Sequence, residues 1–354
     1  MLALILLIVI LGILIFVHEL GHYLTAKNRG AYVYEFALGM GPKIWSFKRK
    51  KETGDPTEYS LRLFPIGGFC AIAGEVDEND GSDVKLKKSD YMCNKKIWER
   101  CLILIAGVTM NFLTGILLLF ISGLIWGSIE QKTIIGTAPE GYPIYEAGIR
   151  VGDQVLSIDG RKVKTWDDIT LVLNLKHKSD EYVFTIKKED GSIKNYIVVP
   201  KVVKSEDGTE GKVFGIGQDA TKKKGFIASI KYAFGKTWAT IRSMGMIIGS
   251  LITGQLSLGA LSGPVGVYSI VGEAAKTSAE SVIYLMAYLS LNLGFINILP
   301  FPAFDGGRVL FLIIEKIRGK KMNPKIENAI NSVGFALLMF LMLIITVKDV
   351  LNLF

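Results

Sequence analysis

Two histidines and a glutamate stand within five residues, HELGH, directly after an apolar run that begins at Leu2. Residues i and i+4 share one face of an α-helix, so His18 and His22 can ligate one metal ion while Glu19 lies near the remaining coordination position. Zinc hydrolases use this arrangement, because zinc lowers the pKa of a bound water toward ~7 and the glutamate takes the proton. The spacing therefore predicts hydrolytic zinc chemistry, with one Zn²⁺ per chain.

The competing interpretation is that both histidines are ordinary polar residues of a helix packed among other helices. A charged group inside a bilayer costs on the order of 2.5 kcal/mol or more, so such groups are functional by default. Three ionisable residues in five positions of a membrane-length apolar stretch favour the functional site over a structural one.

A catalytic zinc normally takes three protein ligands, so the pair of histidines needs a partner from elsewhere. The chain has only one further histidine, His177, in a polar stretch, and we interpret it as a solvated surface residue. The better candidate is Asp305 in NILPFPAFDGGR, where Pro300 and Pro302 predict a break in the helix and irregular backbone that lines a cavity. By spacing alone, a helix kink with Asp305 as an N-cap remains open.

The elements that carry these residues are apolar and long. Half of the 354 residues are hydrophobic, and roughly 20 residues cross a bilayer as a helix. Four runs meet this length: 2–17 extended to 26, 102–129, 281–304 and 329–347. The first run could instead be a cleaved signal peptide, but it has no basic region before it and no small-x-small site after it.

The net charge of +8 comes largely from clusters beside these runs, KRKK at 48–51 and five basic residues within 316–325. Basic clusters next to spans mark cytoplasmic loops, so they indicate topology and not a nucleic-acid partner. Both termini and residues 130–218 are then extracytoplasmic, and the HELGH and DGG motifs lie toward the cytoplasmic side. The three cysteines have no CxxC spacing and predict neither a disulfide framework nor a cysteine zinc site.

Residues 59–72 alternate loosely, are rich in β-branched and aromatic side chains, and contain the turn pair Gly67-Gly68. This pattern predicts a short hairpin at about 57–75. A hairpin buried beside the metal could pair its edge with an unwound substrate strand, whereas the alternative is a cytoplasmic surface hairpin.

The long polar stretch has the pattern of a small α+β domain. EAGIRVGDQVLSIDGRKVKTWDDITLVL predicts a short strand and then a helix opened by Thr165, and residues on both sides of Asp190-Gly191 alternate as a hairpin. The run AGIRVGDQVLSIDG resembles the PDZ domain, over about 133–218. PDZ domains take peptide termini or strands by edge addition. Residues 219–280 predict an amphipathic interfacial segment, with a fifth span as the alternative.

HELGH together with NILPFPAFDGG resembles the site-2 protease family of intramembrane metalloproteases. The resemblance implies that Asp305 is the third zinc ligand and that Asn297 helps to hold the substrate backbone. FALGMGPKIW, FPIGGFCAIAGE, AGVTMNFLTG and SGPVGVYSIVGEAA agree with the family in order along nearly the whole chain. One departure is Phe304, where the family usually has leucine before DG.

We therefore expect a polytopic α-helical membrane protein with four transmembrane helices, a re-entrant β-hairpin and one inserted α+β PDZ domain. The expected parts are a membrane core at 1–129 and 281–354, the PDZ domain at 130–218 and the interfacial segment at 219–280. The candidate residues are Glu19 as catalytic base, His18, His22 and Asp305 as metal ligands, and Asn297, Gly67, Gly68, Pro300 and Pro302 at the substrate.

The expected function is zinc-dependent cleavage of single-span membrane proteins within or beside the bilayer of a bacterial cytoplasmic membrane. Anti-sigma factors and remnant signal peptides are the substrate types implied, trimmed first by another protease. The other expected partners are a peptide terminus or strand at the PDZ domain and membrane lipid. The alternatives are a non-catalytic metal-binding or transport protein, a PDZ membrane scaffold, and a membrane zinc protease whose third ligand is a glutamate.

Overall fold

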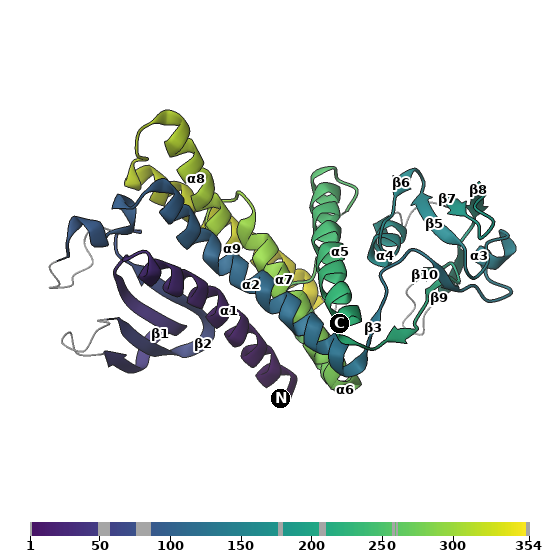
Figure 1. The fold of residues 1–354 in the computed structure, drawn as a ribbon, viewed down its shortest axis with the longest axis horizontal. Helices are drawn as coiled ribbons and strands as arrows, with labels where there is room; N and C mark the ends of the chain where they lie inside the picture. The colour runs from purple at the N-terminus through teal and green to yellow at the C-terminus, as the bar shows by residue number, and fades with distance from the viewer. Residues whose placement is uncertain are drawn as a thin grey trace. The chain divides into compact units, whose positions relative to one another are not determined.

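The computed structural model describes residues 2–48, 57–75, 86–175, 180–204, 210–256, 259 and 261–351. The chain divides into two compact units. Residues 1–118 and 261–354 form the first, and residues 119–260 form the second (Figure 1).

Four helices of the described residues are long and apolar enough to cross a membrane: α1 (Leu2–Asn28), α2 (Ile97–Trp126), α7 (Ala279–Ile298) and α9 (Pro324–Leu351). Large apolar side chains face outward along them, such as Phe340 of α9, which is 63% exposed. Helices satisfy their own backbone hydrogen bonds, which lets such surfaces face lipid. The four predicted spans are confirmed, and the protein is a polytopic membrane protein.

In the first unit, α1 packs on α6 (Pro264–Thr277) and α7 through a small apolar core that includes Leu14, Val271 and Leu285. At its other end α1 approaches α2 closely, because a Cβ at Gly21 would lie 2.4 Å from the carbonyl oxygen of Ala106. Only glycine allows the two backbones this separation. The HELGH segment is thereby held against the middle of α2.

The helical structure is interrupted between α7, which ends at Ile298, and α8 (Asp305–Arg318). The predicted interruption at the proline and glycine residues is confirmed. A Cβ at Gly306 would come 2.2 Å from the carbonyl oxygen of Ile298, so the start of α8 folds tightly onto the end of α7. The N-cap of α8 is Phe304, and Asp305 is the first helical residue. The alternative with Asp305 as an N-cap is therefore wrong, and its carboxylate is available for other contacts.

Two bent strands, β1 (Val33–Lys48) and β2 (Glu58–Ile72), lie against α1 (Figure 1). The sequence pattern predicts that residues 59–72 pair with themselves about Gly67-Gly68. In the structure the partner of this stretch is β1, since Phe36 pairs with both Tyr59 and Cys70. Residues 58–61 and residues 68–72 of β2 therefore lie on opposite sides of residues 33–38 of β1 and both pair with them. Gly67, with a φ of +90°, turns β2 between these two segments. Two short 3₁₀ helices, Lys88–Asp90 and Met92–Asn94, precede α2.

The second unit contains a mixed helix and sheet domain around buried Tyr182, Phe184 and Ile186. The predicted helix is confirmed as α4, with the Thr165 hydroxyl accepting from the Asp168 amide at 3.2 Å. The hairpin about Asp190-Gly191 is confirmed by the β7–β8 pairing. A four-stranded sheet runs in the order β6-β5-β7-β8, and β10-β9, β11-β4 and β12-β3 form separate pairs. The elements are β3 (Ser128–Ile129), β4 (Ile135–Thr137), α3 (Pro143–Glu146), β5 (Gln154–Ile158), β6 (Arg161–Lys162), α4 (Trp166–Leu175), β7 (Tyr182–Lys187), β8 (Ile193–Val198), β9 (Lys201–Lys204), β10 (Glu210–Val213), β11 (Gly217–Gln218) and β12 (Lys222–Lys223).

Helix α5 (Phe226–Ile252) completes the second unit and packs on α4. Lys236 reaches Asp167 and Arg242 reaches Asp168, each at 2.8 Å. On its outer surface Phe234 and Trp238 are both 60% exposed. With its charged residues, α5 is not among the four apolar helices found in the described residues.

Candidate metal centre

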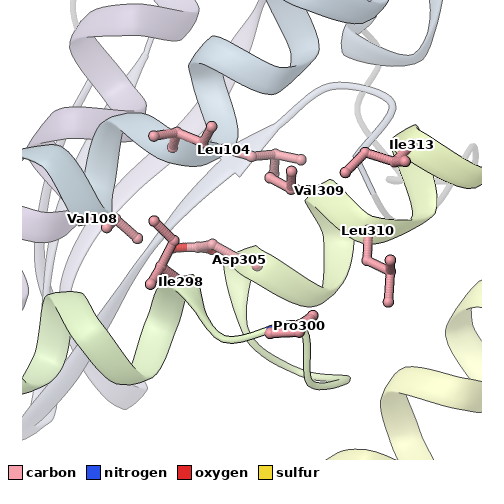
Figure 2. A pocket seen from close by; sticks show the side chains of 10 residues that line it. Leu104, Val108, Ile298, Pro300, Asp305, Val309, Leu310 and Ile313 are labelled. Atoms are coloured by element: carbon pink, nitrogen blue, oxygen red, sulfur yellow. The ribbon is translucent and has the colours of Figure 1, made fainter. Parts of the chain in front are cut away.

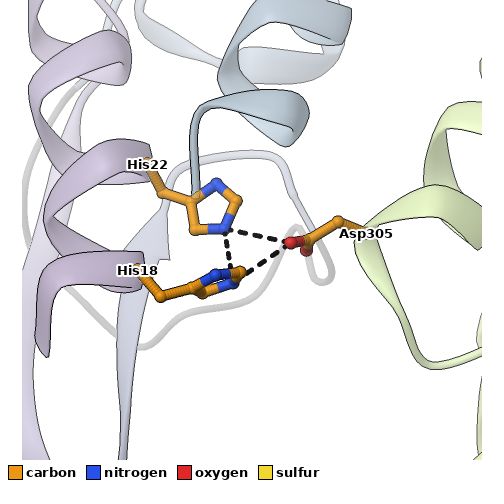
Figure 3. Close-up of side chains that lie close together, drawn as sticks. All are labelled: His18, His22 and Asp305. Atoms are coloured by element: carbon orange, nitrogen blue, oxygen red, sulfur yellow. Dashed lines mark hydrogen bonds and ion pairs between the residues drawn. The ribbon is translucent and has the colours of Figure 1, made fainter. Parts of the chain in front are cut away.

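The first unit brings two histidines of α1 and the first residue of α8 together, as Figure 3 shows. The Nε2 atoms of His18 and His22 lie 3.2 Å apart. The Oδ2 atom of Asp305 lies 3.1 Å from the first and 3.4 Å from the second. Both histidines are only 8% exposed. Three residues from positions 18, 22 and 305 of the chain therefore direct three electron-pair donors at one point.

These separations fit a zinc ion. Bonds of about 2.0–2.1 Å in a tetrahedron place neighbouring ligand atoms about 3.3 Å apart, and two imidazole nitrogens with one carboxylate oxygen are a common donor set for catalytic zinc. The Oδ2 atom of Asp305 is also buried without a hydrogen bond of good geometry from any described residue. A zinc ion held by these three side chains would have room for a water or substrate ligand.

The ring of His22 is oriented by the backbone of α2. Its Nδ1–H donates to the carbonyl oxygen of Ile103 at 2.8 Å, which leaves the lone pair of Nε2 directed at the cluster. Metal-binding histidines are commonly fixed in this way, because the hydrogen bond at one nitrogen sets the tautomer at the other. On the ring of His18, the Nδ1 atom lies 3.1 Å from the side-chain nitrogen of Asn111.

The remaining predicted residues lie on α1, β2, α7 and the link between α7 and α8. Glu19 is half-buried on α1, and its Cγ would be 3.6 Å from a Cβ at Gly68 of β2. The Gly67-Gly68 corner therefore reaches the HELGH helix. Asn297 is half-buried in the last turn of α7. Pro302 lies against Gly334 of α9, where a Cβ would meet it at 2.4 Å. His177 lies outside the described residues.

An apolar cavity of about 250 Å³ opens beside Asp305, between α2, the α7–α8 link and α8 (Figure 2). Asp305 forms part of its wall, so the cavity adjoins the candidate metal site. The other residues that line it include Leu104, Val108, Ile298, Pro300, Val309 and Leu310.

Asn111 and Gly107 of α2 are site residues that the sequence analysis did not single out. The available signal was an isolated asparagine in an otherwise apolar span, since a polar group at membrane depth suggests function. Gly107 carried no signal, because its requirement comes from side chains that reach it from another helix.

Residues 6–341 of the chain match the model of the family described as Peptidase family M50. The chain belongs to this family. The predicted site-2 protease resemblance is thus confirmed, and this M50 protein is a zinc metalloprotease of a multi-pass bacterial membrane type. It is 32% identical to the zinc metalloprotease RasP of Bacillus licheniformis, with 98% of each chain covered. It is also 32% identical to the regulator of sigma-W protease RasP of Bacillus subtilis, again over 98% of each chain. A RasP of Geobacillus kaustophilus shares 32% identity over 98% of this chain and 97% of its own length.

Proposed function

We propose that His18, His22 and Asp305 hold the catalytic zinc of this M50 protease and that Glu19 is its general base. The observation that carries the proposal is the approach of their three donor atoms to within 3.4 Å of one another. Burying two imidazole nitrogens and a carboxylate together is unfavourable, because each group loses hydration. Apolar packing therefore does not explain the cluster, whereas metal binding does. The reaction is hydrolysis of a peptide bond in a single-span membrane protein, within or beside the membrane.

His18, His22 and Asp305 would hold the zinc ion, which would supply Lewis-acid chemistry at the scissile carbonyl and at the attacking water. The chain's own residues do the rest. Glu19 takes a proton from the attacking water and passes it to the leaving amine, which is general base and then general acid catalysis. Asn297 donates from its side-chain amide to the substrate backbone and orients the bond to be cut.

A transmembrane helix hides its peptide bonds in i to i+4 hydrogen bonds, so the substrate must unwind before water reaches it. We propose that β2 assists this step as a re-entrant element. Residues 68–72 pair with β1 along one edge, and no described strand occupies the other. Because Gly68 lies beside Glu19, a substrate strand added there would run past the catalytic base. Gly67, Gly68, Pro300 and Pro302 shape the surface that receives it.

The topology proposed from the basic clusters places both termini outside the cytoplasm and the metal centre toward the cytoplasmic side. Residues 1–129 and 281–354 would form the membrane core, 130–218 an extracytoplasmic PDZ domain and 219–280 an interfacial segment in contact with lipid. The PDZ domain would exclude untrimmed substrates by size or bind the terminus that another protease has created.

The substrate class is proposed from a relative's name. The Bacillus subtilis relative is called a regulator of sigma-W protease, which supports membrane-anchored regulators of anti-sigma type as substrates. Remnant signal peptides have the same single-span chemistry and are the second type proposed.

The test compares membrane proteomes of cells that carry the intact protein or its Glu19→Gln form. Single-span proteins should accumulate in the variant cells, trimmed at the outer side. Unchanged membrane proteomes with unchanged zinc content would favour a metal carrier, which needs ligands but no base. A PDZ scaffold would bind partners equally in both strains.

A further inference from the structure

The side chain of Asn111 is completely buried in α2, at the depth of the metal centre. Its backbone oxygen accepts a hydrogen bond from the Ser290 hydroxyl of α7 at 2.8 Å, which fixes this turn of the helix. Its amide group faces the ring of His18, with a nitrogen to Nδ1 distance of 3.1 Å. The amide oxygen is buried and has no hydrogen-bond partner among the described residues.

A neutral imidazole carries one N–H, so the partner at one ring nitrogen decides what the other can do. If the amide nitrogen donates to Nδ1 of His18, the proton sits on Nε2, which lies 3.1 Å from Asp305 and can donate to it. This arrangement cannot bind a metal at Nε2. If the amide oxygen faces His18, it accepts the Nδ1–H, and Nε2 presents its lone pair to the cluster.

Half a turn about the last side-chain bond of asparagine exchanges its oxygen and nitrogen with almost no change of shape. His22 has no such choice, because a backbone carbonyl at Ile103 can only accept. We infer that Asn111 is a positioning residue that selects the tautomer of His18. Its nitrogen stabilises the zinc-free site through the Nε2–H to Asp305 contact, and its oxygen stabilises the zinc-loaded site. This inference rests on the proposed zinc ligands.

A purely structural role for Asn111 makes the opposite prediction for two variants. Leucine has the same branching and the same number of heavy atoms as asparagine and suits an apolar span, whereas aspartate places a charge there. Packing alone therefore favours Asn111→Leu over Asn111→Asp. Tautomer selection favours Asn111→Asp, because a carboxylate accepts the Nδ1–H of His18 and leucine accepts nothing.

The experiment measures zinc affinity of the full-length protein in lipid nanodiscs by competition with a chelator. Asn111→Leu should bind zinc about 10- to 100-fold more weakly than wild type, as changes to partners of metal-binding histidines generally do. Asn111→Asp should bind at least tenfold more tightly than Asn111→Leu. The matched control is Asn292→Leu on α7, whose amide contacts the Tyr288 carbonyl, and it should bind as wild type does.

Wild-type affinity in Asn111→Leu, or weaker binding in Asn111→Asp than in Asn111→Leu, would overturn the inference. If the leucine variant does not fold, Asn111→Ala takes its place. The His18→Ala variant distinguishes the proposed metal site from the proposed role of Asn111. If His18→Ala loses zinc while Asn111→Leu binds it as wild type does, the metal site is supported and the role of Asn111 is excluded. Equal zinc binding in wild type and His18→Ala would remove the proposed metal site itself.

The cavity beside Asp305 carries a second, independent inference. Its volume of about 250 Å³ lies below the ~300–1,000 Å³ of pockets for drug-sized ligands, so it suits a side chain rather than a whole molecule. Val108 and Leu104 at its base are 2% and 4% exposed, while Leu310 at its mouth is 37% exposed. The cavity wall is therefore buried on the α2 side and exposed at Leu310 on the α8 side.

Among the described residues that form the wall, Asp305 alone carries a charge, and in the proposed site its carboxylate is engaged by the metal. The remaining surface is apolar and offers nothing to pair with a charge or amide, which would lose hydration on entry. We propose that the cavity is the subsite for one large apolar side chain of the substrate, next to the scissile bond. This deepens the proposed protease function and depends on it.

The test uses full-length protein in liposomes with a single-span substrate whose residues on either side of the cleavage site are changed one at a time. At one of these substrate positions, substrates with leucine or phenylalanine should be cleaved on the order of tenfold to a hundredfold faster than the substrate with alanine. Substrates with lysine or aspartate at that position should be cleaved more slowly than the alanine substrate. Val108→Phe fills the base of the cavity and should abolish that preference. Leu117→Phe, on an exposed part of α2, should keep it.

An unchanged preference in Val108→Phe would overturn the proposed subsite. If Val108→Phe does not fold, Leu310→Trp narrows the mouth instead and should give the same loss. A wild-type protein that cleaves no substrate would count against the proposed function, whereas normal cleavage without any preference would count only against the subsite.

Discussion

Gly107 of α2 lies against the ring of His22, so closely that a Cβ at position 107 would come within 2.3 Å of Nε2. The same atom would lie 2.8 Å from Cε1 of His18. The helix that orients the histidines therefore also has to leave room for them. Alanine is favourable in a helix interior, so a loss caused by Gly107→Ala cannot come from helix propensity.

Gly107→Ala should lower zinc affinity by roughly tenfold or more, because both rings must move and a metal site tolerates only small displacements of its ligands. Chelator competition on the purified protein measures this. Gly12→Ala is the control, since a Cβ at this position of α1 would have no atom within 4 Å of it. Equal zinc affinity in Gly107→Ala and wild type would contradict the close packing described here.

Each of His18→Ala, His22→Ala and Asp305→Ala should reduce bound zinc, because two remaining ligands hold the ion poorly. His177→Ala should retain one zinc per chain. Metal analysis of the purified proteins provides the measurement. Full zinc content in Asp305→Ala would remove that residue from the ligand set.

The proposed topology predicts which single cysteines an impermeant reagent can reach. In a background without Cys70, Cys93 and Cys101, cysteine at position 190 should react from outside the cell. Cysteine at 48 or 320 should react only after the membrane is opened, because both basic loops are expected in the cytoplasm. Labelling of position 320 from outside would sink the four-span topology and restore the fifth span.

The contact between α4 and α5 makes a prediction for the second unit. Asp168 is fully buried and accepts from Arg242 at 2.8 Å as well as from two backbone amides. Arg242→Met should destabilise this contact by about 2 kcal/mol, since a buried carboxylate would lose its counter-ion but keep its backbone donors. Hydrogen exchange of α4 in the full-length protein should be faster, whereas Lys231→Met, on an exposed part of α5, should leave it unchanged.

The sequence was sufficient for the parts of the fold that depend on local patterns. Apolar length predicted the four long helices, HELGH spacing predicted one ligating face, and proline with paired glycine predicted the break before Asp305. The sequence did not predict the strand pairing, because residues 59–72 contain a plausible turn and yet pair with residues 33–38. Local alternation does not specify which distant strand completes a ladder.

The surroundings of the candidate metal centre also depend on contacts between distant segments. Ile103, Gly107 and Asn111 line one face of α2, four residues apart, and each meets a histidine of α1. That face is visible only when the crossing of the two helices is known. An asparagine in an apolar span is a signal of function that the sequence analysis did not use, and the atom that Asn111 contacts could be found only in the structure.

We propose Glu19 as the base of a zinc protease whose metal ligands are His18, His22 and Asp305. The most direct measurement is the rate at which zinc-loaded wild-type and Glu19→Gln proteins, reconstituted in liposomes, cut a single-span substrate. Glutamine keeps the shape of the side chain but cannot take a proton, so zinc content should be equal and cleavage roughly 10²- to 10⁴-fold slower. Cleavage by zinc-loaded Glu19→Gln at the wild-type rate would contradict the account.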